Sequence, residues 1–235
     1  MPESALDTAG IVALKRQELG DEENDFLERL NLSTQSIYHR VQFCEYHYSV
    51  LAEILSEDNL VLDRLGEYQR AGDTVSVRFV YEANIFAFIQ NLHALLDSFP
   101  YALNLFFPVI DDPDSCDVAW SKKFMAKYRS FSFSGELTNF CVNEEFQLLR
   151  GYTNAMKHRK LLRVKNNWRH LEFEEMNYEG VSLDGQGGFS RTQKIAPEVN
   201  VMEYLVRCHD KLIPSYFRLW EEIKNEKINV LSSAT

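Results

Sequence analysis

A helical pattern and the main functional clue of this chain coincide in Glu144–His170, EEFQLLRGYTNAMKHRKLLRVKNNWRH. The apolar residues of this stretch recur at helical spacing, and no Asp or Glu occurs between Gln147 and Leu171. The same interval contains the cations Arg150, Lys157, Arg159, Lys160, Arg163, Lys165 and Arg169. Because the whole chain carries a formal net charge of -10, this local excess of positive charge indicates a site for an anionic ligand.

Four polar side chains in this stretch recur at helical spacing. Arg150, Asn154, Lys157 and His158 return to nearly the same face of a helix that has about 3.6 residues per turn. Together they offer two cations, an amide and an imidazole that titrates near neutral pH. Such groups can hold a phosphate and move a proton beside it. The alternative is a solvated helix face with no ligand.

Composition bounds the class of protein. A chain of 235 residues with 45% hydrophobic and 26% charged content is typical of a globular protein of one large or two small domains. Gly and Pro are scarce, at 10 and 6, whereas Phe and Tyr number 16 and 11. These values predict a mostly helical protein packed through aromatic side chains. Without internal repeats or a long linker, we expect one domain over residues 1–235.

The acidic balance limits the kind of nucleic-acid binding that is possible. A sequence pI near 5.1 argues against a protein that coats nucleic acid through general electrostatics, which needs clustered Lys and Arg. A local basic site on an acidic body remains compatible with recognition at short range.

Cysteine usage and hydropathy predict a cytoplasmic protein without a membrane helix. Cys44, Cys116, Cys141 and Cys208 form no CxxC pair, and the first residues, MPESALDTAG, lack a signal sequence. The apolar segment 79–107 is interrupted by too many polar residues to span a bilayer.

Two Cys/His pairs, Cys44 with His47 and Cys208 with His209, raise the question of a zinc site. Adjacent residues point to different sides of a helix, and neither pair has the spacing of a zinc motif. We therefore predict no metal and no cofactor. Cys141 falls among core positions and is interpreted as a small buried hydrophobe.

The periodicity predicts helices over most of the chain. The first is a helix within 1–20 ended by Gly20, with a loosely attached arm as the alternative. A long helix follows over 26–55, either continuous or broken near 31–34 with Ser33 or Thr34 as the cap of its second part. We further expect a central helix over 79–99 bounded by Pro100, a short helix over 120–128 and a long helix over 136–162. We expect the segment 56–74 to be a connection with one helical turn around 60–68, and 111–117 to be a loop.

Beyond Leu162 the period changes from helical to alternating. Residues 163–196 are predicted to form two or three short antiparallel strands, with a hairpin turn at Asp184–Gly185. A last helix over 197–226, kinked at Pro214, and a flexible tail over 227–235 complete the prediction.

Two segments together resemble a known family. A long apolar helix ending in LLDSFPYALN (Leu95–Asn104), followed by a later helix with GYTNAMKHRKLLR (Gly151–Arg163), is similar to the HEPN superfamily of small helical bundles. The resemblance is particularly to divergent bacterial members with an Asn-x-x-Lys-His motif, here Asn154 to His158. The resemblance implies an all-α HEPN-like helical bundle, with 21–162 as core helices and 163–196 as a small antiparallel β insertion before the last long helix.

The resemblance also implies a function. In that family an Arg and a His on one helix, commonly with Asn directly after the Arg, cleave RNA without a metal across a homodimer. Asn154 and His158 match this motif, but Thr153 stands at the expected Arg position. Arg150 and Lys157 are the available substitutes. The catalytic candidates are therefore Arg150, Asn154 and His158, and the candidates for RNA or phosphate binding are Lys157, Arg159, Lys160 and Arg163.

Three functions follow as hypotheses. The first is an RNA-directed protein of bacterial stress or defence, acting as a metal-independent endoribonuclease in which His158 transfers a proton and Arg150 holds the phosphate. The second is a non-catalytic HEPN-like interaction or assembly module, which Thr153 and the acidic composition favour. In the third, Asn154, Lys157 and His158 only tie the helix to its neighbours. A protein partner or antitoxin is not identified by the residues.

Overall fold

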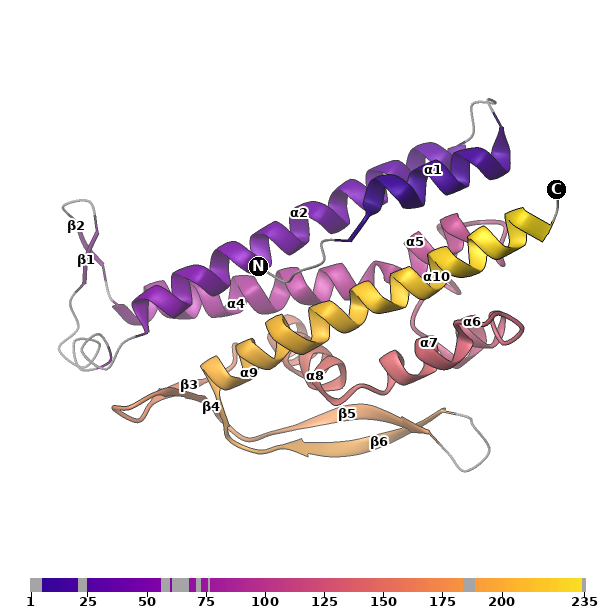
Figure 1. Ribbon diagram of the computed structural model, residues 1–235. Coiled ribbons are helices and arrows are strands. Elements are labelled where there is room, and N and C mark those ends of the chain that lie inside the picture. Colours follow the sequence, from indigo (N-terminus) through magenta and orange to yellow (C-terminus); the bar gives the residue numbers. More distant parts are fainter. Residues whose placement is uncertain are drawn as a thin grey trace.

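The computed structural model describes residues 6–20, 25–55, 60, 68–70, 73–75, 77–183 and 189–233 (Figure 1). The chain is mostly helical, with small antiparallel sheets. The helices are α1 (Thr8–Leu19), α2 (Asp25–Ile54), α4 (Val77–Asp97), α5 (Phe99–Phe106), α6 (Lys122–Ala126), α7 (Ser134–Cys141), α8 (Glu144–His158), α9 (Val201–Arg207) and α10 (Ile213–Ser233).

The strands form three small antiparallel sheets. They are β1 (Tyr68–Arg70), β2 (Asp73–Val75), β3 (Val164–Asn166), β4 (Leu171–Phe173), β5 (Met176–Leu183), β6 (Phe189–Ala196) and β7 (Val199–Asn200). The pair β1–β2 was not predicted from the sequence. The predicted β region 163–196 contains four described strands instead of two or three. β3 and β4 form a sheet with β7, which lies where the last helix was expected to begin, in the order β3-β4-β7. β5 pairs with β6 from Met176 opposite Ala196 to Leu183 opposite Phe189. The predicted Asp184–Gly185 turn lies outside the described residues.

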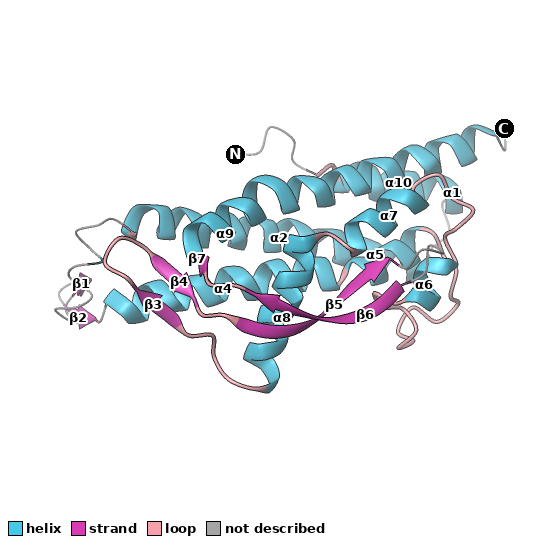
Figure 2. Cartoon of the chain, turned by 90° about the horizontal axis from the view of Figure 1, so that it is seen from below, coloured by secondary structure: helices cyan, strands magenta, loops and turns pink. Residues whose placement is uncertain are grey.

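Long helices make one layer of the molecule. Helices α1, α2, α4 and α10 lie side by side, and α8 crosses below them toward the β5–β6 hairpin (Figure 1). Seen from below, α8 projects out of this layer with its last turn beyond the hairpin (Figure 2). Its first half is therefore enclosed by neighbouring elements, and its C-terminal end is not.

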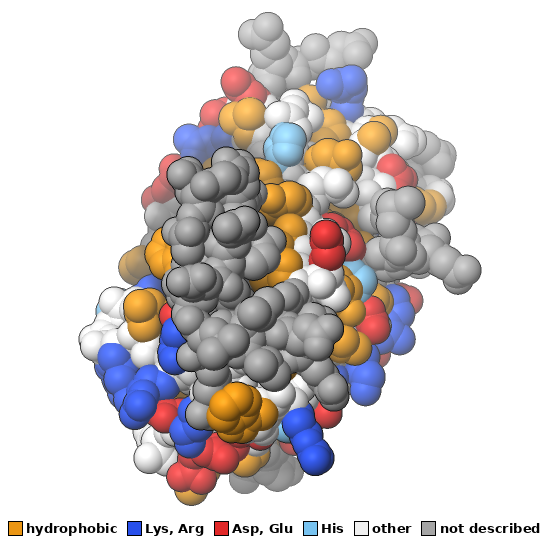
Figure 3. Space-filling model, turned by 90° about the vertical axis from the view of Figure 1, so that its left-hand side faces the viewer, with side chains coloured by type: hydrophobic (Ala, Val, Ile, Leu, Met, Phe, Trp, Pro, Cys, Tyr) orange, Lys and Arg blue, Asp and Glu red, His pale blue; other side chains and the backbone are white. Residues whose placement is uncertain are grey.

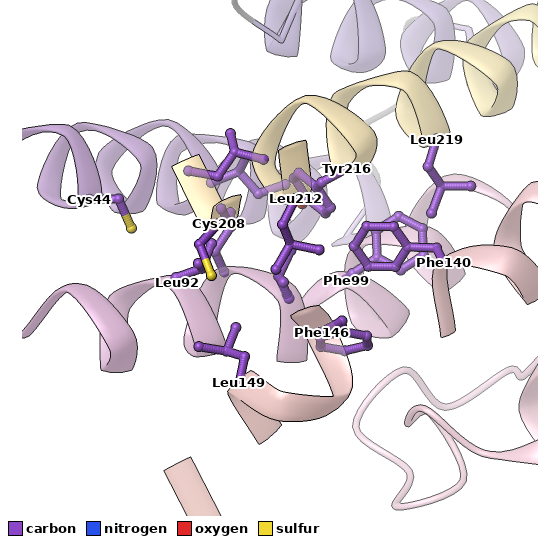
Figure 4. Close-up of a cluster of buried hydrophobic side chains, with 14 of the residues drawn as sticks. Cys44, Leu92, Phe99, Phe140, Phe146, Leu149, Cys208, Leu212, Tyr216 and Leu219 are labelled. Carbon is purple, nitrogen blue, oxygen red and sulfur yellow. The ribbon is translucent and has the colours of Figure 1, made fainter. Parts of the chain in front are cut away.

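The core between these elements is rich in aromatic rings. Phe99 stacks on Trp120 at 5.2 Å between ring centroids and meets the Trp220 ring edge-to-face at 5.3 Å. Figure 4 shows Phe140, Phe146 and Tyr216 converging near Phe99 from three other helices. Full burial of such a side chain contributes roughly 1.5–3 kcal/mol, so these rings hold α5, α7, α8 and α10 together.

The helix predicted over 136–162 is wrong in both its continuity and its end. The chain breaks between α7 and α8, where the Asn143 side chain caps α8 by accepting a hydrogen bond from the Phe146 backbone N–H at 3.0 Å. Helix α8 ends at His158, and the chain then runs toward β3. The apolar period continues across this break, which is why the break was not predicted.

Of the two alternatives for 26–55, the structure shows the unbroken helix, because α2 is continuous from Asp25 to Ile54. Thr34 does not cap a second helix; its hydroxyl donates to the Asn31 carbonyl oxygen at 2.9 Å inside the same helix. Pro100 does mark a boundary, since α4 ends at Asp97 and Pro100 occupies the first turn of α5. Of the helical turn expected at 60–68, the described residues include only Leu60 and the strand β1.

The C-terminal region differs from the prediction in two ways. The last helical region begins at Val201 rather than at 197, and a π-helical turn at Cys208–Leu212 lies just ahead of Pro214. Residues 227–233 belong to α10 rather than to a flexible tail, and residues 234–235 lie outside the described part. Lys227 is buried, ion-paired to Glu18 at 2.7 Å and placed 4.0 Å from the Phe107 ring centroid, which fastens α10 to α1.

The hairpin β5–β6 docks on the first half of α8 through two residues of that helix. Gln147 is buried, and its side-chain oxygen accepts from the Val181 backbone N–H at 2.8 Å while its amide donates to the Cys141 carbonyl oxygen. A Cβ atom on Gly151 would lie 2.8 Å from Tyr178 of β5, so only glycine allows this approach. No described helix has the combination of length and apolar character needed to cross a bilayer.

Candidate functional site

The predicted motif residues of α8 occupy different environments. Arg150 is half-buried, with its guanidinium carbon 5.7 Å from the Phe146 ring centroid, whereas Asn154, Lys157 and His158 are exposed. Lys157 and His158 belong to the last turn of α8, and this end of the helix extends past the β5–β6 hairpin (Figure 2).

Thr153, which stands where the resemblance expects an Arg, is buried and structural. Its hydroxyl donates to the Leu149 carbonyl oxygen one turn earlier, at 2.9 Å. The Thr153 hydroxyl therefore makes its hydrogen bond within the helix, and the side chain supplies no charge. Any cation that acts on a phosphate here must come from Arg150, Lys157 or a neighbouring element.

The basic segment after the motif is only partly free of ion pairs. Among the described residues, no carboxylate lies within ion-pair distance of Lys157, Arg159 or Lys160, which are all exposed. Arg163 differs, because its guanidinium lies 3.4 Å from the Glu174 carboxylate. Of the predicted phosphate-binding residues, Lys157, Arg159 and Lys160 therefore retain uncompensated charge, and Arg163 is partly neutralised.

An imidazole from another helix lies beside the cations of α8. His93 of α4 is only 5% exposed, and burial lowers its pKa to about 4. The Asp97 carboxylate opposes this shift, and the positive charges of Lys157 and Arg150 strengthen it. Lys157 lines the same cavity as His93, whereas Arg150 is not among the residues that line it. At neutral pH, His93 is an uncharged imidazole with one N–H donor and one acceptor nitrogen.

A cavity of about 560 Å³ opens at this imidazole between α2, α4 and α8. Its lining includes Arg40 of α2, Asn91, His93 and Asp97 of α4, and Thr153 and Lys157 of α8. Asn154 and His158 are not among its lining residues. The structure therefore divides the predicted motif: Lys157 faces the cavity, and His158 stays on the exposed end of the helix.

His93 and Arg40 were not among the residues predicted from the sequence. The sequence does contain a signal for His93, because His93 and Asp97 are one turn apart in an otherwise apolar helix. These polar residues were used only to exclude a membrane span. Arg40 carries no comparable signal, since its place beside α4 and α8 depends on how three helices pack.

An exposed indole follows the basic segment along the chain. Trp168, in the turn between β3 and β4, is 50% exposed and has a φ of 79°, a left-handed conformation that is strained for a large side chain. The Asn166 side-chain oxygen holds the turn by accepting from the Trp168 backbone N–H at 2.9 Å. Figure 3, seen from the β1–β2 end, shows Lys and Arg side chains on both sides of a hydrophobic side chain near the lower edge of this face.

The cysteine and histidine pairs that were considered for zinc serve packing. Cys44 and Cys208 are buried, and His209 stacks on Tyr48 with 4.2 Å between ring centroids. Within the described ranges, no group of three or more His, Cys, Asp or Glu side chains could hold a metal ion. Cys141 is also buried, and its pKa is raised to about 11, as expected for a packed thiol.

No protein-family model matches the chain, and no curated protein or solved structure matches it either.

Proposed function

We propose that this chain is an RNA-directed protein of HEPN type, and that the last turn of α8 with the following basic residues is its phosphate-binding surface. The supporting observation is the set of exposed cations Lys157, Arg159 and Lys160, which have no carboxylate partner among the described residues of a protein with net charge -10. Unpaired cations on an acidic body keep their full attraction for phosphate at short range.

Two further features suit RNA in single-stranded form. The exposed Trp168 indole offers a flat surface on which a base can stack, and such stacking tolerates any sequence. Trp168 follows the basic residues along the chain, in the turn after β3. Phosphates would lie along the cations while a base stacks on the indole.

The chemistry proposed for this surface is metal-independent cleavage of an RNA strand. His158 is the exposed imidazole that can move a proton, and Arg150 and Lys157 can neutralise the charge that develops on the phosphate. Asn154, one turn before His158 and exposed, can orient the ligand. In the HEPN family such sites face each other across a homodimer, and we propose a second copy of this chain as the partner.

A non-catalytic interaction module is the second candidate, and Thr153 favours it. The residue that replaces the expected Arg is buried and hydrogen-bonded within α8, so the fixed cation next to Asn154 is missing. A module of this kind would keep the helical body and its partner surface and would bind RNA or protein without cleaving it.

Cleavage of labelled RNA separates the two candidates. The purified protein is incubated with single-stranded RNA and with tRNA in the presence of a chelator, and wild type is compared with His158→Ala. The exposed histidine of α2, in His39→Ala, provides a matched control. Cleavage that is lost in His158→Ala and kept in His39→Ala supports the nuclease. Absence of cleavage by the folded wild-type protein over a range of salt and pH contradicts it and supports the module.

A further inference from the structure

We propose that the cavity between α2, α4 and α8 is a phosphate-binding site, with Arg40 and Lys157 on its walls and His93 inside it. The ligand class is a phosphate group, either free or part of an RNA backbone. Only the choice of RNA as the source of the phosphate rests on the proposed function. The site itself can be tested with inorganic phosphate, without RNA.

The charges around the cavity favour an anion. Arg40 and Lys157 line it, and Arg150 acts electrostatically on His93 from the same helix as Lys157. Asp97 is the carboxylate that opposes them among the described lining residues. Two cations, one from α2 and one from α8, thus line the cavity together with one carboxylate. An anion between them interacts with positive charge from both sides.

His93 gives this site a hydrogen-bond donor that carries no charge. The ring is only 5% exposed and yet belongs to the cavity lining, so its remaining accessible surface faces the cavity. As a neutral imidazole, it can donate one N–H to a phosphate oxygen. The Arg40 guanidinium is held in place by the bond from its Nε to the Ser36 hydroxyl oxygen at 3.2 Å, which leaves its terminal nitrogens to bind an oxyanion.

The size of the cavity is compatible with more than a free phosphate ion. A volume of about 560 Å³ lies in the range of roughly 300–1,000 Å³ that is typical of small-molecule sites. A phosphate at the cations would leave room for an attached sugar or base. The exposed cations Arg159 and Lys160 lie two and three residues after Lys157 in the chain, so a strand bound at the cavity can continue over them.

Calorimetric titration with inorganic phosphate, in a phosphate-free buffer at neutral pH, is the test. We expect saturable binding that weakens about tenfold or more in Arg40→Gln and in Lys157→Gln, since each removes one charge-assisted contact. Asp97→Asn should strengthen binding, because it removes the opposing carboxylate. Lys122→Gln, an exposed lysine of α6 outside the cavity, should have no effect.

A second titration, with a short single-stranded RNA, distinguishes the source of the phosphate. RNA binding that is sensitive to Arg40 and Lys157, without binding of free phosphate, supports the site and assigns it to the RNA backbone. Binding of either ligand that responds equally to Lys122→Gln, or that does not respond to Arg40→Gln and Lys157→Gln, overturns the proposal. So does the absence of binding of both ligands. If the protein binds phosphate but does not cleave RNA, the phosphate site is supported and the nuclease function is contradicted.

Titration of the His93 ring by NMR adds a readout that a structural role would not change. Bound phosphate places negative charge beside the imidazole. This charge acts in the same direction as Asp97 and opposes the effect of the cations Arg40, Arg150 and Lys157, so the pKa of His93 should rise from about 4. By linkage, phosphate should bind more tightly as the pH falls toward that value. The His93 signal is assigned from its loss in His93→Gln. A pKa that is unchanged at saturating phosphate overturns the role of His93.

Discussion

The two halves of α8 show how one helix can hold both a structural and a functional surface. Phe146, Gln147 and Gly151 in the first half are buried against α7 and β5, and each has a neighbour that fixes its identity. Asn154, Lys157 and His158 in the second half are exposed, and their types are not required by packing. Residues that the fold does not need are the better candidates for function, whereas equal helical spacing alone does not bring side chains to one site.

The largest effect expected from this comparison is in the first half. Phe146→Ala removes a fully buried ring that contacts Trp120 and Phe140, and it should lower the free energy of unfolding by about 3–5 kcal/mol. Urea denaturation measures this value. Asn154→Ala in the exposed half is the control, with an expected change of at most about 0.5 kcal/mol. Similar losses in both variants would contradict the division of α8.

The pH dependence of stability tests the environment of His93, next to the second half. Because its pKa is about 4 in the folded protein against 6.5 ordinarily, the unfolded chain takes up the proton first. The folded protein therefore keeps its full stability, as far as His93 is concerned, above pH 6.5. As the pH falls from 6.5 toward 4, protonation of this histidine in the unfolded chain lowers the free energy of unfolding by about 2–3 kcal/mol. Urea denaturation at several pH values should show a shallower slope in His93→Gln over this window. An unchanged slope would mean that the ring is not buried as described.

The contact between Gly151 and Tyr178 should give a smaller effect. Gly151→Val places side-chain atoms where a Cβ already lies 2.8 Å from Tyr178, so the hairpin must move away from α8. We expect a loss of roughly 1–3 kcal/mol in the free energy of unfolding. The double variant with Tyr178→Ala should recover part of this loss. If Gly151→Val alone is stabilising, the close approach of β5 to α8 is wrong.

The smallest effect on stability is expected at Lys157. This cation lies in the last turn of α8, where positive charge complements the helix dipole, so Lys157→Gln should cost only about 0.3–1 kcal/mol. Thermal or urea unfolding checks the value. A loss as large as that of Phe146→Ala would show that Lys157 serves the fold, which would remove it from both the proposed surface and the proposed cavity.

The helical elements could be predicted where a single stripe of apolar residues determines one buried face. Helices α2 and α4 follow such stripes, and Pro100 marks the end of α4 for a local steric reason. The break at Asn143 was missed because the apolar period continues through it. Capping by one side-chain oxygen is a weaker signal in the sequence than periodicity.

The candidate site could be predicted only on the helix that carries it. The exposure of Asn154, Lys157 and His158 agrees with their spacing along α8. The cavity beside Lys157 could not be predicted, because Arg40 and His93 are far from Lys157 in the chain and meet it only through the packing of α2, α4 and α8. Local sequence patterns contain no information about which faces of distant helices meet.

Binding of fluorescently labelled single-stranded RNA tests the central claim most directly. Anisotropy titrations compare wild type, the triple variant Lys157→Gln, Arg159→Gln, Lys160→Gln, and a charge-matched triple variant of exposed residues near α6, Lys122→Gln, Lys127→Gln, Arg129→Gln. We predict that the first variant binds RNA much more weakly, and that its affinity depends less steeply on salt, by about 0.7 for each phosphate that it no longer neutralises. The α6 variant should bind like wild type. Equally weakened binding in both triple variants, or wild-type affinity in the α8 variant, would contradict a phosphate-binding surface at the end of α8.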